Sequence, residues 1–318
     1  MTDPQPRRWR RWIELAAAFL VLGFLAAYLV QNWGQIAAHD WRIDWPRVAL
    51  ASAGTAAAYS GLVILWRHVI SIFGGSLSLV DAHRIWYLSN LARYVPGKVL
   101  QLAGAAYLGR AKGVRPVVSI ASTMTAQLFV LGAGLIVALI AVPDAAAEAP
   151  LLGLAAPVAA VLFLALLLSP LFGLLHRLLL RMIGRESYYV PIRWRERLGL
   201  TAGYVVLWVL LGGSFHFFLT AVTDMPRGTF WPITGIFAAA YLAGYLAFFV
   251  PGGLGVREGA LAILLSLYIP ATIAVAAAVL ARIWTTAVEL VVVAVLLGRY
   301  GITDLWAGAE PTPRKIHG

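Results

Sequence analysis

Long apolar runs separated by short polar loops dominate the chain. Seven of these runs approach or exceed the roughly 20 residues that an α-helix needs to cross the hydrocarbon core of a bilayer. They are residues 13–30, 48–66, 116–142, 151–175, 200–221, 231–250 and 271–297. The pattern predicts an all-α protein, a polytopic bundle of transmembrane helices.

Two further apolar stretches, residues 85–108 and 254–269, are interrupted by helix-breaking residues. The first contains Arg93, Pro96, Gly97 and Lys98. The second follows directly after Pro251, Gly252 and Gly253. Interrupted helices at membrane depth are tolerated only where they are buried in protein or line a watered cavity. We therefore predict two broken or re-entrant segments and about seven or eight spans in all, with the crossing of residues 254–269 left open.

The two interruptions belong to an internal repeat. Residues 86–98 align with residues 241–253 without a gap, aromatic on aromatic and Val-Pro-Gly on Val-Pro-Gly. Paired interrupted segments in corresponding halves are the best sequence pointer to the substrate site of a transporter. The prediction is a single transmembrane domain, residues 1–318. Within it we expect two structural repeats, at about residues 13–175 and 200–298.

Composition agrees with a membrane protein. The chain is 61% hydrophobic and 12% charged, whereas soluble domains have roughly 45 to 50% and 25%. Its 25 Lys plus Arg outnumber 14 Asp plus Glu, an excess that belongs to cytoplasmic loops and does not indicate nucleic-acid binding. The arginines at residues 7–11 place the N-terminus in the cytoplasm, and the side of the C-terminus stays open.

Charge inside the last predicted helix is the strongest functional signal. Arg282 and Glu289 lie two helical turns apart on one face. A charged group at the bilayer centre costs roughly 2.5 to 3.5 kcal/mol, so both should face the bundle interior and have partners, of which Arg257 and Glu258 are the best candidates. Such a pair marks a functional site by default; the alternative is a salt bridge that only fixes helix packing.

Four charged residues lie beside the two interruptions: Arg93, Lys98, Arg257 and Glu258. Unwound backbone and helix N-termini expose N–H donors there, and together with arginine they suit an anion such as a lipid phosphate. For Arg93 and Lys98 the alternative is that they reach out to the cytoplasmic interface.

The helix predicted at residues 116–142 carries a milder polar stripe. Its members are Ser119, Ser122, Thr123 and Gln127. Small hydroxyl residues are ordinary packing contacts between membrane helices, so we assign this stripe no substrate role.

Enzyme signatures are absent from the sequence. There is no zinc-protease motif, no nucleophile elbow, no P-loop and no dinucleotide fingerprint, and there is no cysteine. We expect no enzyme, no cofactor and no metal site. Without a nucleotide motif, any transport should be independent of ATP hydrolysis by this chain.

The interrupted motifs resemble a known family. Residues 93–98 read Arg-Tyr-Val-Pro-Gly-Lys, and residues 249–260 read Phe-Val-Pro-Gly-Gly-Leu-Gly-Val-Arg-Glu-Gly-Ala. With Gly-Arg-Ala-Lys-Gly at 109–113 and Arg282 in the next helix, the chain resembles the lysylphosphatidylglycerol synthetase transmembrane family, a flippase-like domain. The resemblance implies lipid handling. Fused members carry a C-terminal aminoacyl-transferase domain; because this chain ends 21 residues after Leu297, we expect a stand-alone member without it.

The predicted function is ATP-independent lipid translocation in the plasma (bacterial inner) membrane. The cargo would be an anionic phospholipid, glycolipid, hopanoid or polyprenyl-linked lipid. Arg93 and Lys98 would meet its headgroup at the cytoplasmic mouth of a cleft. The residues lining that cleft would be Arg257, Glu258, Arg282 and Glu289.

The alternative function is a non-catalytic lipid-binding accessory subunit of an envelope-lipid synthesis pathway. A membrane-embedded lipid-modifying enzyme fits less well because no metal or nucleophile constellation appears. Expected partners are the bilayer, a lipid with an anionic headgroup, and either a second copy of the chain or a lipid-synthesis enzyme.

Overall fold

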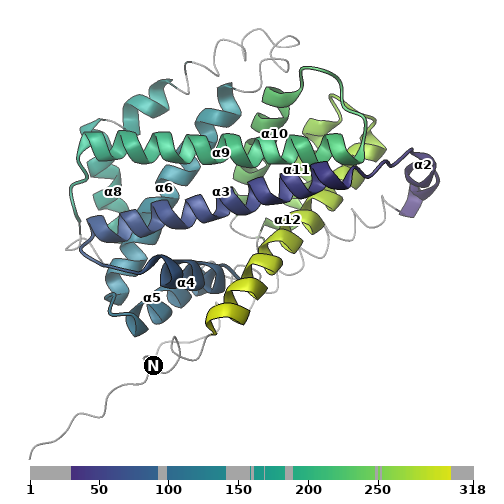
Figure 1. Cartoon of the computed structure of the whole chain (residues 1–318). Coiled ribbons are helices and arrows are strands. Elements are labelled where there is room, and N and C mark those ends of the chain that lie inside the picture. Colours follow the sequence, from purple (N-terminus) through teal and green to yellow (C-terminus); the bar gives the residue numbers. More distant parts are fainter. Residues whose placement is uncertain are drawn as a thin grey trace, which may run out of the picture.

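The computed structural model describes residues 30–91, 99–140, 158, 161–167, 169–182, 189–247, 250 and 253–301. All regular secondary structure in these ranges is helical. The helices are α2 (Trp33–Ala38), α3 (Trp45–Ile72), α4 (Leu79–Leu91), α5 (Val99–Ala111), α6 (Pro116–Ile140), α8 (Pro170–Met182), α9 (Trp194–Val222), α10 (Phe230–Leu246), α11 (Val256–Leu265) and α12 (Ala271–Tyr300) (Figure 1). The predicted all-α fold class is confirmed.

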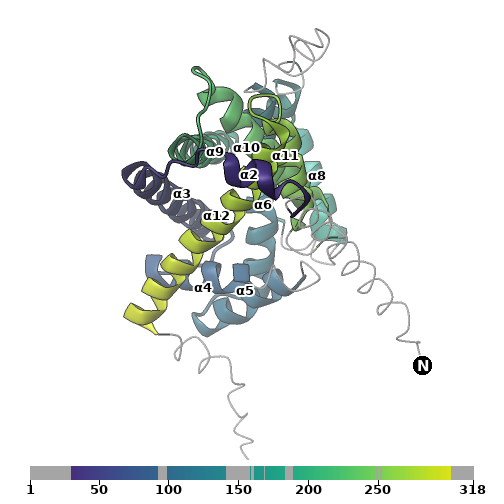
Figure 2. The same cartoon turned by 90° about the vertical axis from the view of Figure 1, so that its right-hand side faces the viewer.

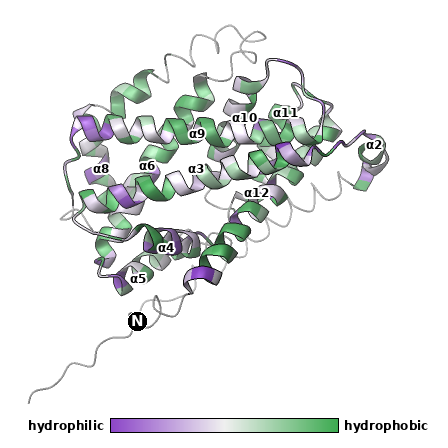
Figure 3. Cartoon of the chain, in the orientation of Figure 1, coloured by the Kyte–Doolittle hydropathy of each residue, from purple (hydrophilic) through white to green (hydrophobic). Residues whose placement is uncertain are grey.

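Four of the described helices are long and apolar enough to cross a membrane: α3, α6, α9 and α12. They match the runs predicted at 48–66, 116–142, 200–221 and 271–297. Hydrophobic residues follow the middle of these helices, and hydrophilic residues gather toward the ends of α3, α9 and α12 (Figure 3). The chain is therefore a multi-pass membrane protein.

The run predicted at 151–175 overlaps a bent pair of helices, Val161–Leu167 and Pro170–Leu178, which meet at 62°. Pro170 explains the bend, because proline has no N–H to donate and its ring crowds the preceding turn. If the pair is one span, the described residues hold five. The first predicted run lies outside the described residues up to position 29, so the total of seven or eight spans stays a prediction.

The segment predicted as a span at 231–250 is shorter in the structure. Helix α10 has 17 residues and ends at Leu246. A helix continued to position 250 would bring the ring of Pro251 against the carbonyl of Ala247, four residues earlier. Helix α11 has 10 residues, about 15 Å of rise, so it is too short to cross a core of roughly 30 Å by itself.

Helices α3 and α9 lie side by side (Figure 1). Glycines at the contact let the two backbones approach: a methyl group on Gly61 would overlap the Leu207 side chain, and one on Gly54 would overlap the Ser214 hydroxyl. Such small residues are what membrane helix pairs use in place of a hydrophobic driving force.

Helices α4 and α5 pack against each other as two arms, with residues 92–98 between them outside the described part. Gly104 faces Ser89, since a Cβ on this glycine would lie 3.6 Å from the Ser89 Cβ. Each arm has 13 residues, about 20 Å of rise, which is less than the hydrocarbon core. The segment predicted to be broken at residues 85–108 therefore contains parts of two short helices and not one long helix; entry and exit on the same membrane side stays a prediction.

A buried arginine ties these arms to the end of α12. Arg84, only 4% exposed, donates from Nη2 to the Gly301 carbonyl at 2.7 Å and from Nη1 to Asp81 at 3.2 Å. Lys112, beyond the end of α5, lies 3.4 Å from the same Asp81. The start of α4 and the end of α5 are therefore neighbours, and Arg84 caps the C-terminus of α12.

The order helix, interruption, short helix, long helix occurs twice. Helix α4 ends at Leu91 and α10 at Leu246, while α6 begins at Pro116 and α12 at Ala271. The differences, 246 minus 91 and 271 minus 116, both equal 155, the offset that aligns residues 86–98 with 241–253. We call α4–α6 the first unit and α10–α12 the second unit. The two short-helix pairs lie at opposite ends of the molecule (Figures 1 and 2).

Candidate functional site

A cavity of about 140 Å³ lies between the two units and helices α3 and α9. Its polar and charged wall residues are Asn90, Gln101, Thr123, Gln127, Arg257 and Arg282. Its aromatic wall residues are Tyr59, Trp66, Trp86, Tyr204, Trp208, Tyr241 and Tyr245. Asn90 and Gln101, on either side of the first predicted interruption, and Gly253 of the second therefore line one cavity. A cavity lined mainly by apolar and aromatic residues, with a few convergent polar groups, is the usual form of a ligand site.

Equivalent positions of the two units face this cavity. Three pairs of wall residues differ by the repeat offset of 155: Trp86 with Tyr241, Asn90 with Tyr245, and Gln127 with Arg282. The match extends from the broken segments to the long helices α6 and α12. The two units thus contribute corresponding positions to one cavity wall.

Arg282 on α12 forms an ion pair with Glu258 on α11. Its Nε lies 3.6 Å from Glu258 Oε1, and the side chains are 16% and 6% exposed. This confirms the predicted contact between the last helix and the second interrupted segment. The other oxygen of Glu258 accepts the backbone N–H of Gly255 at 2.5 Å, which caps the N-terminus of α11. Glu258 thus positions Arg282 through this ion pair. It is not itself among the residues that line the cavity.

Arg257, the other arginine on the cavity wall, contacts aromatic rings. Its guanidinium carbon lies over the rings of Phe237 and Tyr241, 5.0 and 5.2 Å from their centroids, within the range of cation–π attraction. Gly244 on α10 makes room for it, because a Cβ there would stand 2.8 Å from the Arg257 Cβ. Among the described residues, no carboxylate oxygen lies within 4 Å of its guanidinium.

Among the described residues, the wall therefore carries more positive than negative charge. Of the two guanidiniums on it, that of Arg282 is balanced by Glu258, and that of Arg257 rests on aromatic faces. An uncompensated charge in a protein interior costs several kcal/mol. A bound anion would recover part of that cost through charge-assisted hydrogen bonds, and a bidentate one would match the arginine fork.

Glu289 is buried, 2% exposed, and points into the protein as predicted. It lies about 10 Å along α12 from Arg282. It is not among the cavity-lining residues. Arg93 and Lys98 lie outside the described residues, so their place at a cytoplasmic mouth stays a prediction. The described residues contain no group of three or more His, Asp or Glu side chains arranged to hold a metal ion.

The family model for the lysylphosphatidylglycerol synthase TM region matches residues 11–294. The chain belongs to this family. The match covers the first unit, the second unit up to residue 294 and every described residue that lines the cavity. Comparisons with curated proteins and with solved structures gave no match. Family membership indicates a membrane protein with a lipid-related function.

Gln127 is a wall residue to which the sequence pattern assigned no substrate role. Its Nε2 is buried and has no hydrogen-bond partner among the described residues. Thr123, one turn earlier, keeps the predicted packing role: its hydroxyl accepts from Trp66 Nε1 at 3.0 Å and donates to the Ser119 carbonyl at 2.7 Å. The repeat offset from Arg282 is the signal that separates Gln127 from its packing neighbours.

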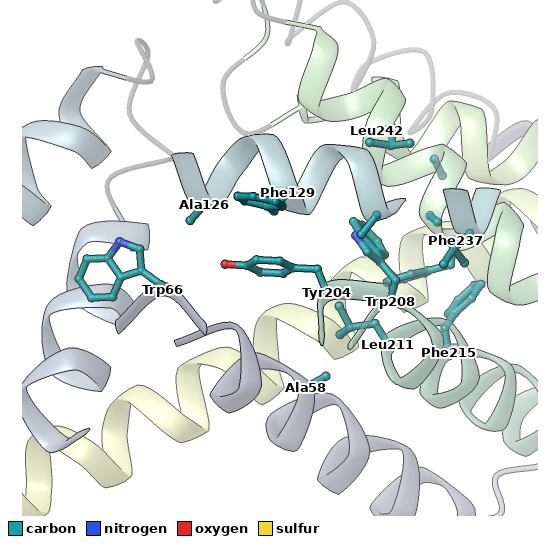
Figure 4. Close-up of a cluster of buried hydrophobic side chains, with 14 of the residues drawn as sticks. Ala58, Trp66, Ala126, Phe129, Tyr204, Trp208, Leu211, Phe215, Phe237 and Leu242 are labelled. Atoms are coloured by element: carbon teal, nitrogen blue, oxygen red, sulfur yellow. The ribbon is translucent and has the colours of Figure 1, made fainter. Parts of the chain in front are cut away.

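Tyr204 of α9 is a second wall residue without a sequence signal. Its ring lies beside Phe129, nearly parallel to it at an angle of 11°. Its hydroxyl points toward Ala126 and Trp66, both of which line the cavity (Figure 4). The neighbouring Trp208 donates its Nε1 hydrogen to the Val130 carbonyl at 2.8 Å. A single tyrosine in a long apolar run is indistinguishable by pattern from a packing residue.

Proposed function

We propose that this chain is an ATP-independent translocase that carries the anionic headgroup of a membrane lipid through the cavity between its two units. The observation that carries the proposal is Arg257: a guanidinium on a cavity wall inside the bundle, placed by Gly244, without a carboxylate within 4 Å among the described residues. A lipid phosphate supplies the missing negative charge.

The size of the cavity supports headgroup binding. A volume of about 140 Å³ is below the roughly 300 to 1,000 Å³ of a site that encloses a drug-sized ligand. It suits a headgroup whose acyl chains remain outside in the bilayer. The polar group would then pass from one leaflet to the other while only its charge and hydrogen-bonding groups require protein partners.

The two arginines would act differently. Arg257 offers its charge and its donor fork to the phosphate. Arg282 is held by Glu258, which also caps α11, so a shift of the short helix would move the charge of Arg282 relative to the cavity. We propose that α11 and Arg282 move as one body during translocation.

The first experiment measures translocation of fluorescent phosphatidylglycerol in proteoliposomes without nucleotide. We expect wild-type activity, and a loss of about tenfold or more in Arg257→Gln, the effect of losing a charged hydrogen bond. Arg257→Lys should fall between the two, because it keeps the charge but loses the planar fork. Arg299→Gln, on the exposed end of α12, is the matched control and should transport normally.

Thermal unfolding in detergent separates function from folding. Arg257→Gln leaves no carboxylate within 4 Å unpaired among the described residues, but it gives up the contact with the rings of Phe237 and Tyr241, so it should unfold close to the wild-type temperature. A wild-type requirement for ATP, or full transport by Arg257→Gln, contradicts the proposal. Lipid that co-purifies with the chain and depends on Arg257, without translocation in liposomes, would favour the accessory-subunit alternative.

A further inference from the structure

The first unit brings uncharged hydrogen-bonding groups to the cavity that a phosphate does not need. Gln101 Nε2 donates to Asn90 Oδ1 at 2.5 Å, which ties the two arms together across the interruption. This hydrogen bond uses one N–H donor of Gln101. Both N–H groups of the Asn90 amide are not used in it and can donate to a ligand. Gln127 Nε2 is buried without a hydrogen-bond partner among the described residues.

We propose that the headgroup is rich in hydroxyls, a phosphate ester of a polyol or a sugar, and that Gln127 and Tyr204 bind its hydroxyl groups. This inference rests on the proposed function. The repeat divides the cavity wall in two, because Gln127 stands in the first unit where Arg282 stands in the second. Phosphate would bind beside Arg257 and Arg282, and the hydroxyls at the end lined by α4 and α6.

The aromatic walls favour the same chemistry. Tyr59, Trp66 and Trp86 line the cavity, and flat apolar rings match the C–H faces of a sugar or a cyclic polyol, whose hydroxyls project from the edge. Aromatic rings also attract ammonium groups. However, the positive charge of Arg257 opposes a cationic headgroup, because like charges brought together in a site of low dielectric repel strongly.

Three lipids of equal charge isolate the contribution of hydroxyls. Phosphatidylethanol, phosphatidylglycerol and phosphatidylinositol each carry one negative charge and differ in having no hydroxyl, a diol, or a ring of hydroxyls. We expect wild-type protein in proteoliposomes to translocate the inositol lipid fastest and the ethanol lipid slowest. The ratio should be about fivefold for each neutral hydrogen bond gained.

Gln127→Leu and Tyr204→Phe should each lower the inositol-to-ethanol rate ratio by about fivefold. The matched controls are Gln35→Leu on the exposed face of α2 and Tyr300→Phe at the exposed end of α12, which should keep the wild-type ratio. Gln127→Leu should unfold no earlier than wild type, because it removes a buried donor that has no partner among the described residues.

The outcomes separate the two proposals. Equal wild-type rates for the three lipids would overturn the hydroxyl preference and leave translocation of anionic lipids standing. No movement of any of them would overturn the proposed function itself. A wild-type preference that survives in both folded variants would overturn the assignment to Gln127 and Tyr204, and so would a Gln127→Leu variant that unfolds well below wild type.

Discussion

The two units share a backbone plan but not their chemistry. Both have a helix, an interruption, a short helix and a long helix in the same register. Among the residues that the structure describes, the second unit places Arg257 and Arg282 on the cavity wall, whereas the first places Asn90, Gln101 and Gln127 there. The backbone arrangement is similar in both units, so the side chains on it can differ. As a result, the described part of the cavity wall has charged residues at one end and neutral polar residues at the other.

The largest expected effect concerns the ion pair of Arg282 with Glu258 in the second unit. Arg282→Ala should destabilise the protein by about 3 to 5 kcal/mol, because it leaves Glu258 buried without its cation. At the equivalent position of the first unit, Gln127→Ala should cost no more than about 2 kcal/mol. Thermal or denaturant unfolding in detergent measures both.

The double variant Arg282→Gln with Glu258→Gln tests what the pair does. The glutamine oxygen at 258 can still accept the Gly255 N–H, so the cap of α11 is kept and the protein should fold. If Arg282 meets the lipid phosphate, this folded variant should lose translocation, since glutamine has neither the charge nor the fork. Full activity would show that the pair only braces the fold. Neutralising Glu289 should not restore the stability that Arg282→Ala loses, because Glu289 lies two helical turns away from position 282.

A smaller loss of stability is expected at Gly244 of the second unit than at Arg282. The equivalent of Gly244 in the first unit, 155 residues earlier, is Ser89. Gly244→Ala should cost about 1 to 3 kcal/mol, since the new methyl would stand 2.8 Å from the Arg257 Cβ. Ser89→Ala should be neutral or slightly stabilising, because the buried Ser89 hydroxyl has no partner among the described residues. Equal losses of stability in the two variants would contradict the packing described for the second unit.

The smallest perturbation tests the first unit without changing its stability greatly. The chain has no cysteine, and the 3.6 Å between the Ser89 Cβ and a Cβ on Gly104 suits a disulfide. Ser89→Cys with Gly104→Cys should therefore cross-link on oxidation, seen as a mobility shift that reductant reverses. Ser89→Cys with Tyr107→Cys, in which the second cysteine lies on an exposed face of α5, should not.

Single cysteines at the two ends of the helix pair α4–α5, which we call the hairpin, test its membrane topology. Ser78 and Arg110 are exposed and lie near the Asp81–Lys112 contact. If the hairpin is re-entrant, cysteines at these two positions should both react with an impermeant reagent from the cytoplasmic side. Reaction from opposite sides would show that the segment crosses the membrane.

Much of the fold could be predicted from the sequence because a bilayer leaves few solutions. Backbone groups in hydrocarbon must bond within their own helix, so the apolar runs predicted α3, α6, α9 and α12 within several residues. Proline and glycine indicated where the two units break. The ion pair of Arg282 with Glu258 was predictable too, since charges on neighbouring apolar segments have few other partners in the bilayer.

Tertiary structure alone decided which residues share the cavity. Whether Gln127 faces a helix or a cavity depends on the packing of segments far apart along the chain, and its own surroundings in sequence are those of a packing residue. Likewise, the cap that Arg84 places on Gly301 joins positions separated by 217 residues. Local pattern specifies helices because their hydrogen bonds are local, whereas a site between helices depends on how their surfaces meet, which the pattern of one helix does not contain.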